Sequence, residues 1–237
     1  AIATVILPNL SAHRAAARED QFASTLDWAM RSVLLIGVPA AVALILLAEP
    51  ILITLFQYGA LTPIDVEMAA LSLRAYSLGL VAFMLVKVLA PGYYARQDTA
   101  TPVKIGIIAM AANMVMNLVF VLPLLWYFNV GHLGLALATS AAAWLNAGLL
   151  LRGLLRQGVF SWQPGWGAYG FRLLASTVAM SVAVMLLDRG VETWLEWGWQ
   201  RRGLEILLVC GAGVTAYLLT QVITGTRMRH LRAPGAV

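Results

Sequence analysis

The sequence predicts an all-α integral membrane protein built as a polytopic helical bundle. Apolar residues make up 61% of the 237 residues and charged residues 11%, whereas soluble globular domains typically contain about 45–50% and about 25%. Apolar runs of about 20 residues, the length that lets a helix span the hydrocarbon core, recur along the chain. These runs are too long and too uniformly apolar for the alternating strands of a β-barrel, so helices are the expected element throughout.

The apolar runs are separated by short polar breaks, and each run predicts one membrane span. The predicted spans are 28–49, 66–94, 103–125, 130–152, 166–187 and 203–224. Residues 1–11, AIATVILPNLS, carry no charged segment and no small-residue cleavage site, so we interpret them as the tail of an earlier span rather than a signal peptide. The chain would then be the C-terminal portion of a longer protein.

Two longer polar breaks organise the chain. The break at 11–27 could hold a short interfacial helix around AAAREDQF. The break at 153–165, GLLRQGVFSWQPG, is the predicted domain boundary. Residues 1–152 would form the first group of membrane helices, beginning inside an earlier helix. Residues 153–237 would form a cytoplasmic linker and a two-helix extension.

The distribution of basic residues predicts the orientation in the membrane, because Lys and Arg accumulate in cytoplasmic loops. One set of alternate breaks is predicted to be cytoplasmic, which also places the C-terminus inside. It holds Arg14, Arg18, Arg31, Arg96, Lys104, Arg152, Arg156, Arg172, Arg227, Arg229 and Arg232, and the other set holds Arg189, Arg201 and Arg202. The basic pI of about 9.7 follows from this rule and from attraction to anionic inner-leaflet lipid, so nucleic acid is not an expected partner.

No motif in the sequence indicates an enzyme. The chain contains neither an HExxH motif nor paired carboxylates in a predicted span. We therefore expect a protein without catalytic residues and without a cofactor.

Two ionisable residues lie well inside a predicted span, and such residues indicate a functional site by default. Arg74 and Lys87 both lie on the span 66–94, each about 10 Å from its nearer end at 1.5 Å per residue. Their separation puts them about 140° apart around the helix, so they do not share a face. Either side chain could instead extend to the nearer membrane interface.

Lys87 shares a helix face with aromatic, glycine and proline residues. Residues on this face are Tyr76, Gly79, Phe83, Lys87, Pro91 and Tyr94, within a stripe about 120° wide. The stripe predicts a cavity wall that is aromatic, flexible and cationic. A lysine in such a cavity would favour an anionic substrate.

Two asparagines on the next predicted span lie one helical turn apart. Because a buried amide costs free energy unless it is hydrogen-bonded, Asn113 and Asn117 predict a contact with another helix, a water or an ion. Thr139, Ser140 and Asn146 on the following span are candidate partners. A cation site built from amide and hydroxyl oxygens is the alternative.

Several sequence stretches carry a family resemblance. They are LFQYGALTPID at 55–65, VKVLAPGYYARQDTATPVKI at 86–105, QPGW at 163–166 and ILPNLS at 6–11. In this order they resemble the MurJ (MviN) family of lipid II flippases, within the multidrug/oligosaccharidyl-lipid/polysaccharide exporter superfamily. The resemblance covers essentially the whole chain.

This resemblance implies the second lobe of a two-lobe flippase, followed by a C-terminal helix pair. The implied activity is transport of lipid II, the lipid-linked disaccharide-pentapeptide, from the inner to the outer leaflet of the bacterial inner membrane by alternating access. Implied partners are lipid II, membrane lipid and an N-terminal lobe that is missing from this chain.

The resemblance also implies roles for particular residues. Lys87 is the candidate cavity residue of the lobe. Some members of the family bind sodium between helices that include the one matching 103–125. Asn113 and Asn117 are therefore candidate ligands for a coupling ion. Arg74, from its depth in the span, and Tyr76 and Tyr94, from the stripe that they share with Lys87, complete the predicted substrate cavity. The resemblance implies a cytoplasmic loop motif of Arg96, Gln97, Asp98, Pro102 and Lys104.

Two other functions remain open from the sequence. One is export of another polyprenyl-linked sugar or of a drug by the same architecture. The other is a non-transporting membrane scaffold that recruits cell-wall enzymes. Replacement of Lys87 would impair transport but not scaffolding.

Overall fold

The computed structural model describes residues 8, 10, 11, 19–59 and 61–225. These residues form helices and connecting turns, with no strand among them, which confirms the predicted fold class. The predicted tail of an earlier span at 1–11 lies mostly outside the described residues, and so does the predicted interfacial helix, except that residues 19–22 belong to the first long helix.

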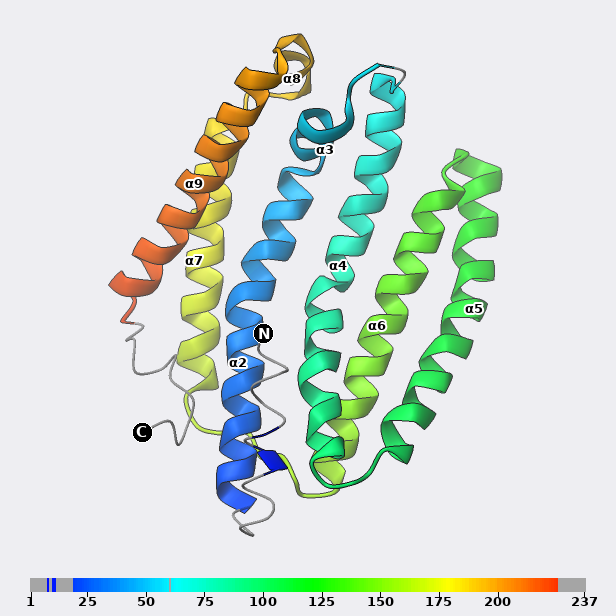
Figure 1. Ribbon diagram of the computed structural model, residues 1–237, viewed down its shortest axis with the longest axis vertical. Coiled ribbons are helices and arrows are strands. Elements are labelled where there is room, and N and C mark those ends of the chain that lie inside the picture. The colour runs from blue at the N-terminus through cyan, green and yellow to red at the C-terminus, as the bar shows by residue number, and fades with distance from the viewer. Residues whose placement is uncertain (1–7, 9, 12–18, 60, 226–237) are drawn as a thin grey trace. The chain divides into compact units, whose positions relative to one another are not determined.

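Among the described residues, the long helices are interrupted by two short ones, one after the first long helix and one before the last (Figure 1). Six are long and apolar enough to cross a membrane, which confirms the predicted spans. In chain order the helices are α2 (Glu19–Leu46), α3 (Ala48–Phe56), α4 (Pro63–Tyr94), α5 (Ala100–Phe128), α6 (Gly131–Arg156), α7 (Trp166–Leu187), α8 (Val191–Glu196) and α9 (Trp199–Ile223).

The first span differs most from its predicted boundaries. The first span was predicted to cover 28–49, but α2 begins at Glu19 and ends at Leu46, and α3 begins separately at Ala48. The extended part of the helix includes Asp27, which forms an i,i+4 ion pair with Arg31. The apolar run alone could reveal neither this extension nor the break before α3.

The described residues divide into two compact units. The first unit comprises those within 1–37 and 79–166, and the second comprises 38–59, 61–78 and 167–225. Helices α2 and α4 contribute to both units. Helix α6 continues to Arg156, past the predicted domain boundary at 152, and the division of the chain at that boundary stays a prediction.

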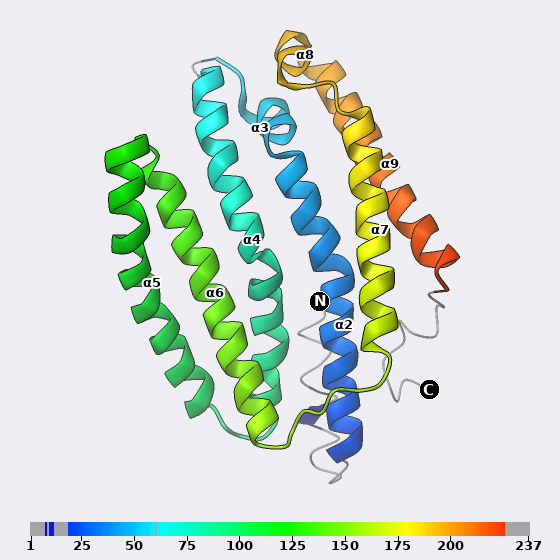
Figure 2. The same ribbon diagram turned by 180° about the vertical axis from the view of Figure 1, so that it is seen from behind.

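In the first unit, α4 and α6 approach closely through small residues. A Cβ added to Gly79 would lie 2.8 Å from the Cα of Ser140, and small residues of this kind let membrane helices pack tightly. Nearer the end of α4, the buried Tyr93 hydroxyl donates to the Leu150 carbonyl at 2.7 Å. Helices α5 and α6 run side by side (Figure 2). These contacts fix the three helices that surround the candidate site.

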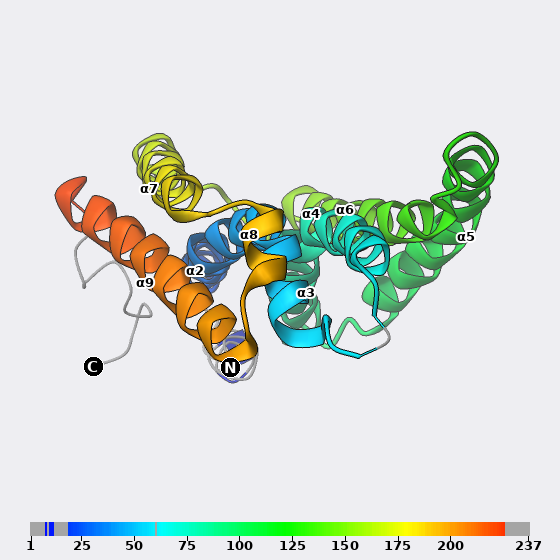
Figure 3. The same cartoon turned by 90° about the horizontal axis from the view of Figure 1, so that it is seen from above.

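In the second unit, α3 packs against α8 and α9 (Figure 3). Ile53, Val66 and Trp194 form its buried core. Helices α7 and α9 meet at Gly213, where an added Cβ would lie 2.9 Å from a methyl group of Val184. The predicted C-terminal helix pair is therefore α7 and α9, with the short α8 between them.

Candidate functional site

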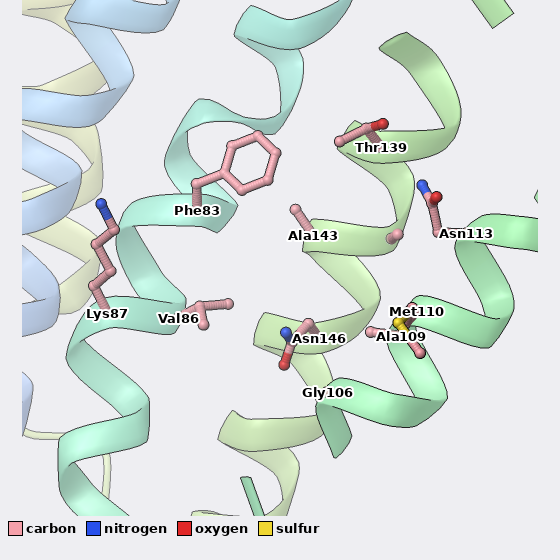
Figure 4. A pocket seen from close by; sticks show the side chains of 11 residues that line it. Phe83, Val86, Lys87, Gly106, Ala109, Met110, Asn113, Thr139, Ala143 and Asn146 are labelled. Carbon is pink, nitrogen blue, oxygen red and sulfur yellow. The ribbon is translucent and has the colours of Figure 1, made fainter. Parts of the chain in front are cut away.

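A cavity of about 540 Å³ lies in the first unit between α4, α5 and α6 (Figure 4). This volume falls within the range of about 300–1,000 Å³ that is typical of small-ligand sites. Most of the wall is apolar. The polar or aromatic side chains that line it are Phe83 and Lys87 from α4, Asn113 from α5, and Thr139 and Asn146 from α6.

Lys87 is the cation of this cavity. Its side chain is exposed, and among the described residues no carboxylate lies within 4.0 Å of its amine. A charge on a membrane-spanning helix is costly unless it meets water or a counterion. The geometry therefore offers a cationic position that is available to an anionic ligand.

The two asparagines of α5 interact with each other. The Asn117 amide nitrogen donates to the Asn113 carbonyl oxygen at 3.1 Å, while the Asn117 carbonyl oxygen is buried without a hydrogen-bond partner among the described residues. Thr139 donates to Leu135 of its own helix at 2.8 Å. The structure thus places Asn113, Thr139 and Asn146 around one cavity without hydrogen bonds between helices at these positions.

The other predicted cavity residues are not among those that line this cavity. Arg74 belongs to the second unit, where its Nη2 lies 3.0 Å from Oε1 of Glu49 and its Nε donates to the Ile45 carbonyl at 3.2 Å. Tyr76 and Tyr94 are partly exposed, at 44% and 42%. Of the four predicted substrate-cavity residues, only Lys87 lines this cavity, and the substrate roles of all four stay predictions.

The predicted loop motif forms a compact link between α4 and α5. Gln97 adopts a left-handed φ of 62°, and the amides of Gln97 and Asp98 donate to the carbonyls of Tyr94 and Tyr93, which is a Schellman motif. Asp98 then accepts a hydrogen bond from the Thr101 amide at 2.9 Å. Hydrogen bonds from Thr101 lower the pKa of the Asp98 carboxyl below its ordinary value of 3.8. Gln97 thus ends α4, and Asp98 caps α5.

The remaining loop residues also have identifiable positions. Arg96 donates to the Gln157 side chain beyond the end of α6. Pro102 is buried in the first turn of α5, where a backbone amide would have no intrahelical partner. Lys104 is exposed. This loop therefore links the ends of three helices.

Sequence reasoning did not find a cluster that holds the QPGW turn. Asp27, only 3% exposed, lies 2.8 Å from the Arg31 Nε and accepts a hydrogen bond from the Trp166 indole at 2.8 Å. Arg31 donates to the carbonyls of Gln163 and Pro164, and its guanidinium lies 5.0 Å from the Trp166 ring centroid. The spacing of Asp27 and Arg31 on a helix was the available signal.

A second missed residue, Arg202, joins three elements of the second unit. It lies in the first turn of α9, is 5% exposed, and its guanidinium lies 5.7 Å from the Tyr58 ring centroid of the FQYG turn. Its nitrogens donate to the carbonyls of Trp194 at 2.9 Å, Leu195 at 3.0 Å, Gln57 at 3.2 Å and Ile53 at 3.3 Å. Helix C-termini carry partial negative charge, so a cation stabilises the ends of both α3 and α8.

Comparisons with known proteins agree on one family. The model described as "Lipid II flippase MurJ" matches residues 1–198. The probable lipid II flippase MurJ of Vibrio cholerae is 47% identical over 233 residues, covering 98% of this chain and 43% of the relative. The Haemophilus influenzae protein of the same description is 40% identical over 237 residues, covering 98% and 45%.

A solved structure shows the same fold. "Lipid II flippase MurJ, inward closed conformation" matches with a TM-score of 0.73 and 25% identity, covering 94% of this chain and 42% of that one. The chain thus spans less than half the length of the relatives that it matches. The matched residues and the shared helical fold together show that this chain belongs to the lipid II flippase MurJ family.

Proposed function

We propose that this chain forms the second lobe and C-terminal helix pair of a transporter that moves lipid II from the inner to the outer leaflet of the bacterial inner membrane. The observation that carries the proposal is Lys87, a cation without a carboxylate partner among the described residues, in a cavity on a membrane-spanning helix. The diphosphate of lipid II supplies the missing counterion. Transport, rather than catalysis, is the activity for which the cavity is suited.

Alternating access requires the diphosphate to bind and then leave. A lysine is a compact point charge on a flexible stem, so it can follow a phosphate without the fixed geometry of a bidentate arginine. Arg74 is already neutralised by Glu49. Arg74, with Tyr76 and Tyr94, would therefore contact substrate only in another conformation, in which the ion pair to Glu49 has opened.

A monovalent cation is the proposed coupling ion. Alkali cations are coordinated by oxygen ligands. The Asn117 carbonyl oxygen, which is buried without a hydrogen-bond partner among the described residues, is a ligand of this kind. Asn113 would hold that amide in place through its hydrogen bond. Removal of sodium from a transport assay should slow wild type more than Asn117→Leu if this assignment is correct.

The proposal also covers the orientation of the chain in the membrane and its need for an N-terminal lobe. Family membership and the membrane-spanning helices support a multi-pass inner-membrane protein. We place the loop with Arg96 and Lys104 and the C-terminus in the cytoplasm, following the positive-inside rule. Since the chain spans less than half of its relatives, we propose that an N-terminal lobe completes the substrate path and that this chain alone does not translocate lipid II.

The test is complementation with the complete gene. The protein is depleted in its bacterium and replaced by wild type, Lys87→Ala or Arg152→Ala at equal levels, and lipid-linked precursor in the outer leaflet is measured. Arg152 is the control, because it is an exposed cation of the same unit that does not line the cavity. We expect wild type and Arg152→Ala to restore precursor exposure and Lys87→Ala to fail.

The same assay separates the alternatives. If exposure of lipid II never falls on depletion, the protein exports another cargo or acts as a scaffold. If exposure falls but Lys87→Ala restores it fully, the flippase activity stands and the assignment of Lys87 to the substrate path is wrong.

A further inference from the structure

Helices α5 and α6 touch at the end where they are connected. The connection has two residues, and Asn129, the first of them, adopts a left-handed φ of 57°. A Cβ added to Gly134 would lie 2.8 Å from the backbone nitrogen of Val121, and one added to Gly131 would lie 3.3 Å from the Leu125 side chain. We call this close contact between the two helices the junction.

Away from the junction the two helices separate. Figure 3 shows them close together near their connection and further apart toward their other ends. The cavity-lining residues of α5 include Gly106, Met110 and Asn113. All three lie within about 80° of Val121 around the helix, so they continue the side that touches α6. A Cβ added to Gly106 would meet open space. One side of α5 therefore touches α6 at the junction and borders the cavity beyond it.

Helix α5 is the least buried of the six membrane-spanning helices among the described residues. Of the most apolar 18 residues of each span, 11% are buried in α5, compared with 44% in α6 and 39% in α4. Pro123 lies inside α5, where it removes a backbone hydrogen bond and lets the helix bend. By contrast, α6 is held to α4 by the close contact of Gly79 with Ser140 and by the hydrogen bond from Tyr93 to Leu150. Of the three walls of the cavity, α5 is therefore the one that can move at least cost.

The walls that α5 and α6 present to the cavity suit a closer contact. Small residues on the two walls are Gly106, Ala109, Ala142 and Ala143. Small residues let membrane helices approach until their backbones touch, which is what happens at the junction. On the same wall of α6, Asn146 makes no hydrogen bond to another described residue. An approach of α5 would bring Asn113 towards this unpaired amide.

We propose that α5 is a lid of the cavity. It pivots at the junction and closes by bringing its Gly106 end against α6, which replaces the cavity by helix contact and expels water from it. The movement takes place within one compact unit, so it differs from the movement of one lobe against another that alternating access requires. Closure depends on the shape of α5 and α6 and not on the identity of the substrate, so it goes beyond the proposed function.

Distances between pairs of spin labels test the lid in the complete protein in lipid nanodiscs. Labels are attached to introduced cysteines after Cys210 and every other native cysteine have been replaced by serine. The lid pair is Ile107→Cys with Leu155→Cys, far from the junction, and the junction pair is Leu122→Cys with Leu135→Cys. All four side chains are exposed. We expect two distance populations for the lid pair and one for the junction pair.

Two glycines provide a matched test of closure. Gly106→Leu puts a large side chain into the space that closure fills, so the shorter-distance population of the lid pair should be lost. Gly148→Leu makes the same change where a Cβ also meets open space, on a part of α6 that does not line the cavity, and both populations should remain. The thermal unfolding midpoint shows whether each variant is folded.

Three results would overturn the lid. One is a single distance population for the lid pair when neither glycine is substituted. Another is a folded Gly106→Leu variant that keeps the shorter-distance population. The third is a junction pair with two populations, because α5 would then shift as a whole instead of pivoting. Since these distances do not depend on the role of Lys87, the lid and the proposed function are tested separately.

Discussion

Replacing Arg202 by alanine should loosen the junction between α9 and the ends of α3 and α8. The guanidinium is buried and donates to four carbonyl oxygens at 2.9–3.3 Å, two in the last turns of each short helix. Alanine removes every one of these hydrogen bonds and the charge that compensates the two helix termini. The packing of α3 against α8 and α9 should therefore be weakened.

The expected magnitude follows from these contacts. A hydrogen bond to a charged group contributes about 1.5–3 kcal/mol, but four bonds to one guanidinium are not additive, and water can hydrate some of the released carbonyls. Removing one partner of a buried charged network typically costs about 3–5 kcal/mol. At about 2–4 °C per kcal/mol for a chain of this size, Arg202→Ala should lower the melting temperature by roughly 10 °C. Arg202→Lys should retain part of the stability, because an ammonium has three donors and no planar fork.

The assay combines thermal unfolding of the complete protein in detergent with hydrogen exchange of the peptides that cover α3 and α8. Arg201→Ala is the matched control, because Arg201 is 64% exposed and lies 4.0 Å from Glu205, and exposed pairs contribute less than about 1 kcal/mol. If Arg202→Ala melts within about 2 °C of wild type and exchange in α3 and α8 is unchanged, the buried guanidinium does not hold this junction.

Three further experiments test the close helix contact, the loop and the Asp27 cluster. Gly79→Ala should destabilise the protein by about 1–3 kcal/mol, because its Cβ would lie 2.8 Å from the α6 backbone; Gly148→Ala, which meets open space, should be neutral or stabilising, and equal melting temperatures would contradict the close approach. Asp98→Ala should cost about 0.5–2 kcal/mol at neutral pH. Folding lowers the pKa of the Asp98 carboxyl. Its contribution to the free energy of unfolding is therefore complete at pH values above the ordinary pKa and is lost as the pH falls through the pKa of the folded protein. The melting temperatures of wild type and Asp98→Ala should converge in acid. A double-mutant cycle of Asp27→Ala and Trp166→Phe should show a coupling of about 0.5–3 kcal/mol, and additive effects would exclude the proposed hydrogen bond.

Part of the candidate site followed from local sequence. Helical periodicity placed Phe83 and Lys87 on one face of a span, and the structure has a cavity on that face. Arg74 shows the limit of this reasoning. Its depth in the span predicted a functional position, but Glu49, which neutralises it, lies on another helix. No periodicity within one helix can show which side chain of another helix will meet it.

The loop motif shows a second kind of limit. The stretch RQDTATPVK was predicted to be a loop between two spans, and the structure shows that Gln97 and Asp98 have different roles in it. Gln97 adopts a left-handed conformation that glycine or asparagine more commonly occupies. Residue preference alone would not have selected it as the residue that ends α4.

The sequence by itself determined the membrane class, the number of spans among the described residues and the family. These depend on the length and apolarity of local segments and on short motifs, which can be read without knowing the fold. Only the tertiary structure decided how Asp27 meets Trp166, 139 residues away, and how Arg202 meets the end of α3, about 145 residues away. The physical reason is that apolar composition places helices in lipid, whereas the partner of a buried polar group depends on which helices pack together.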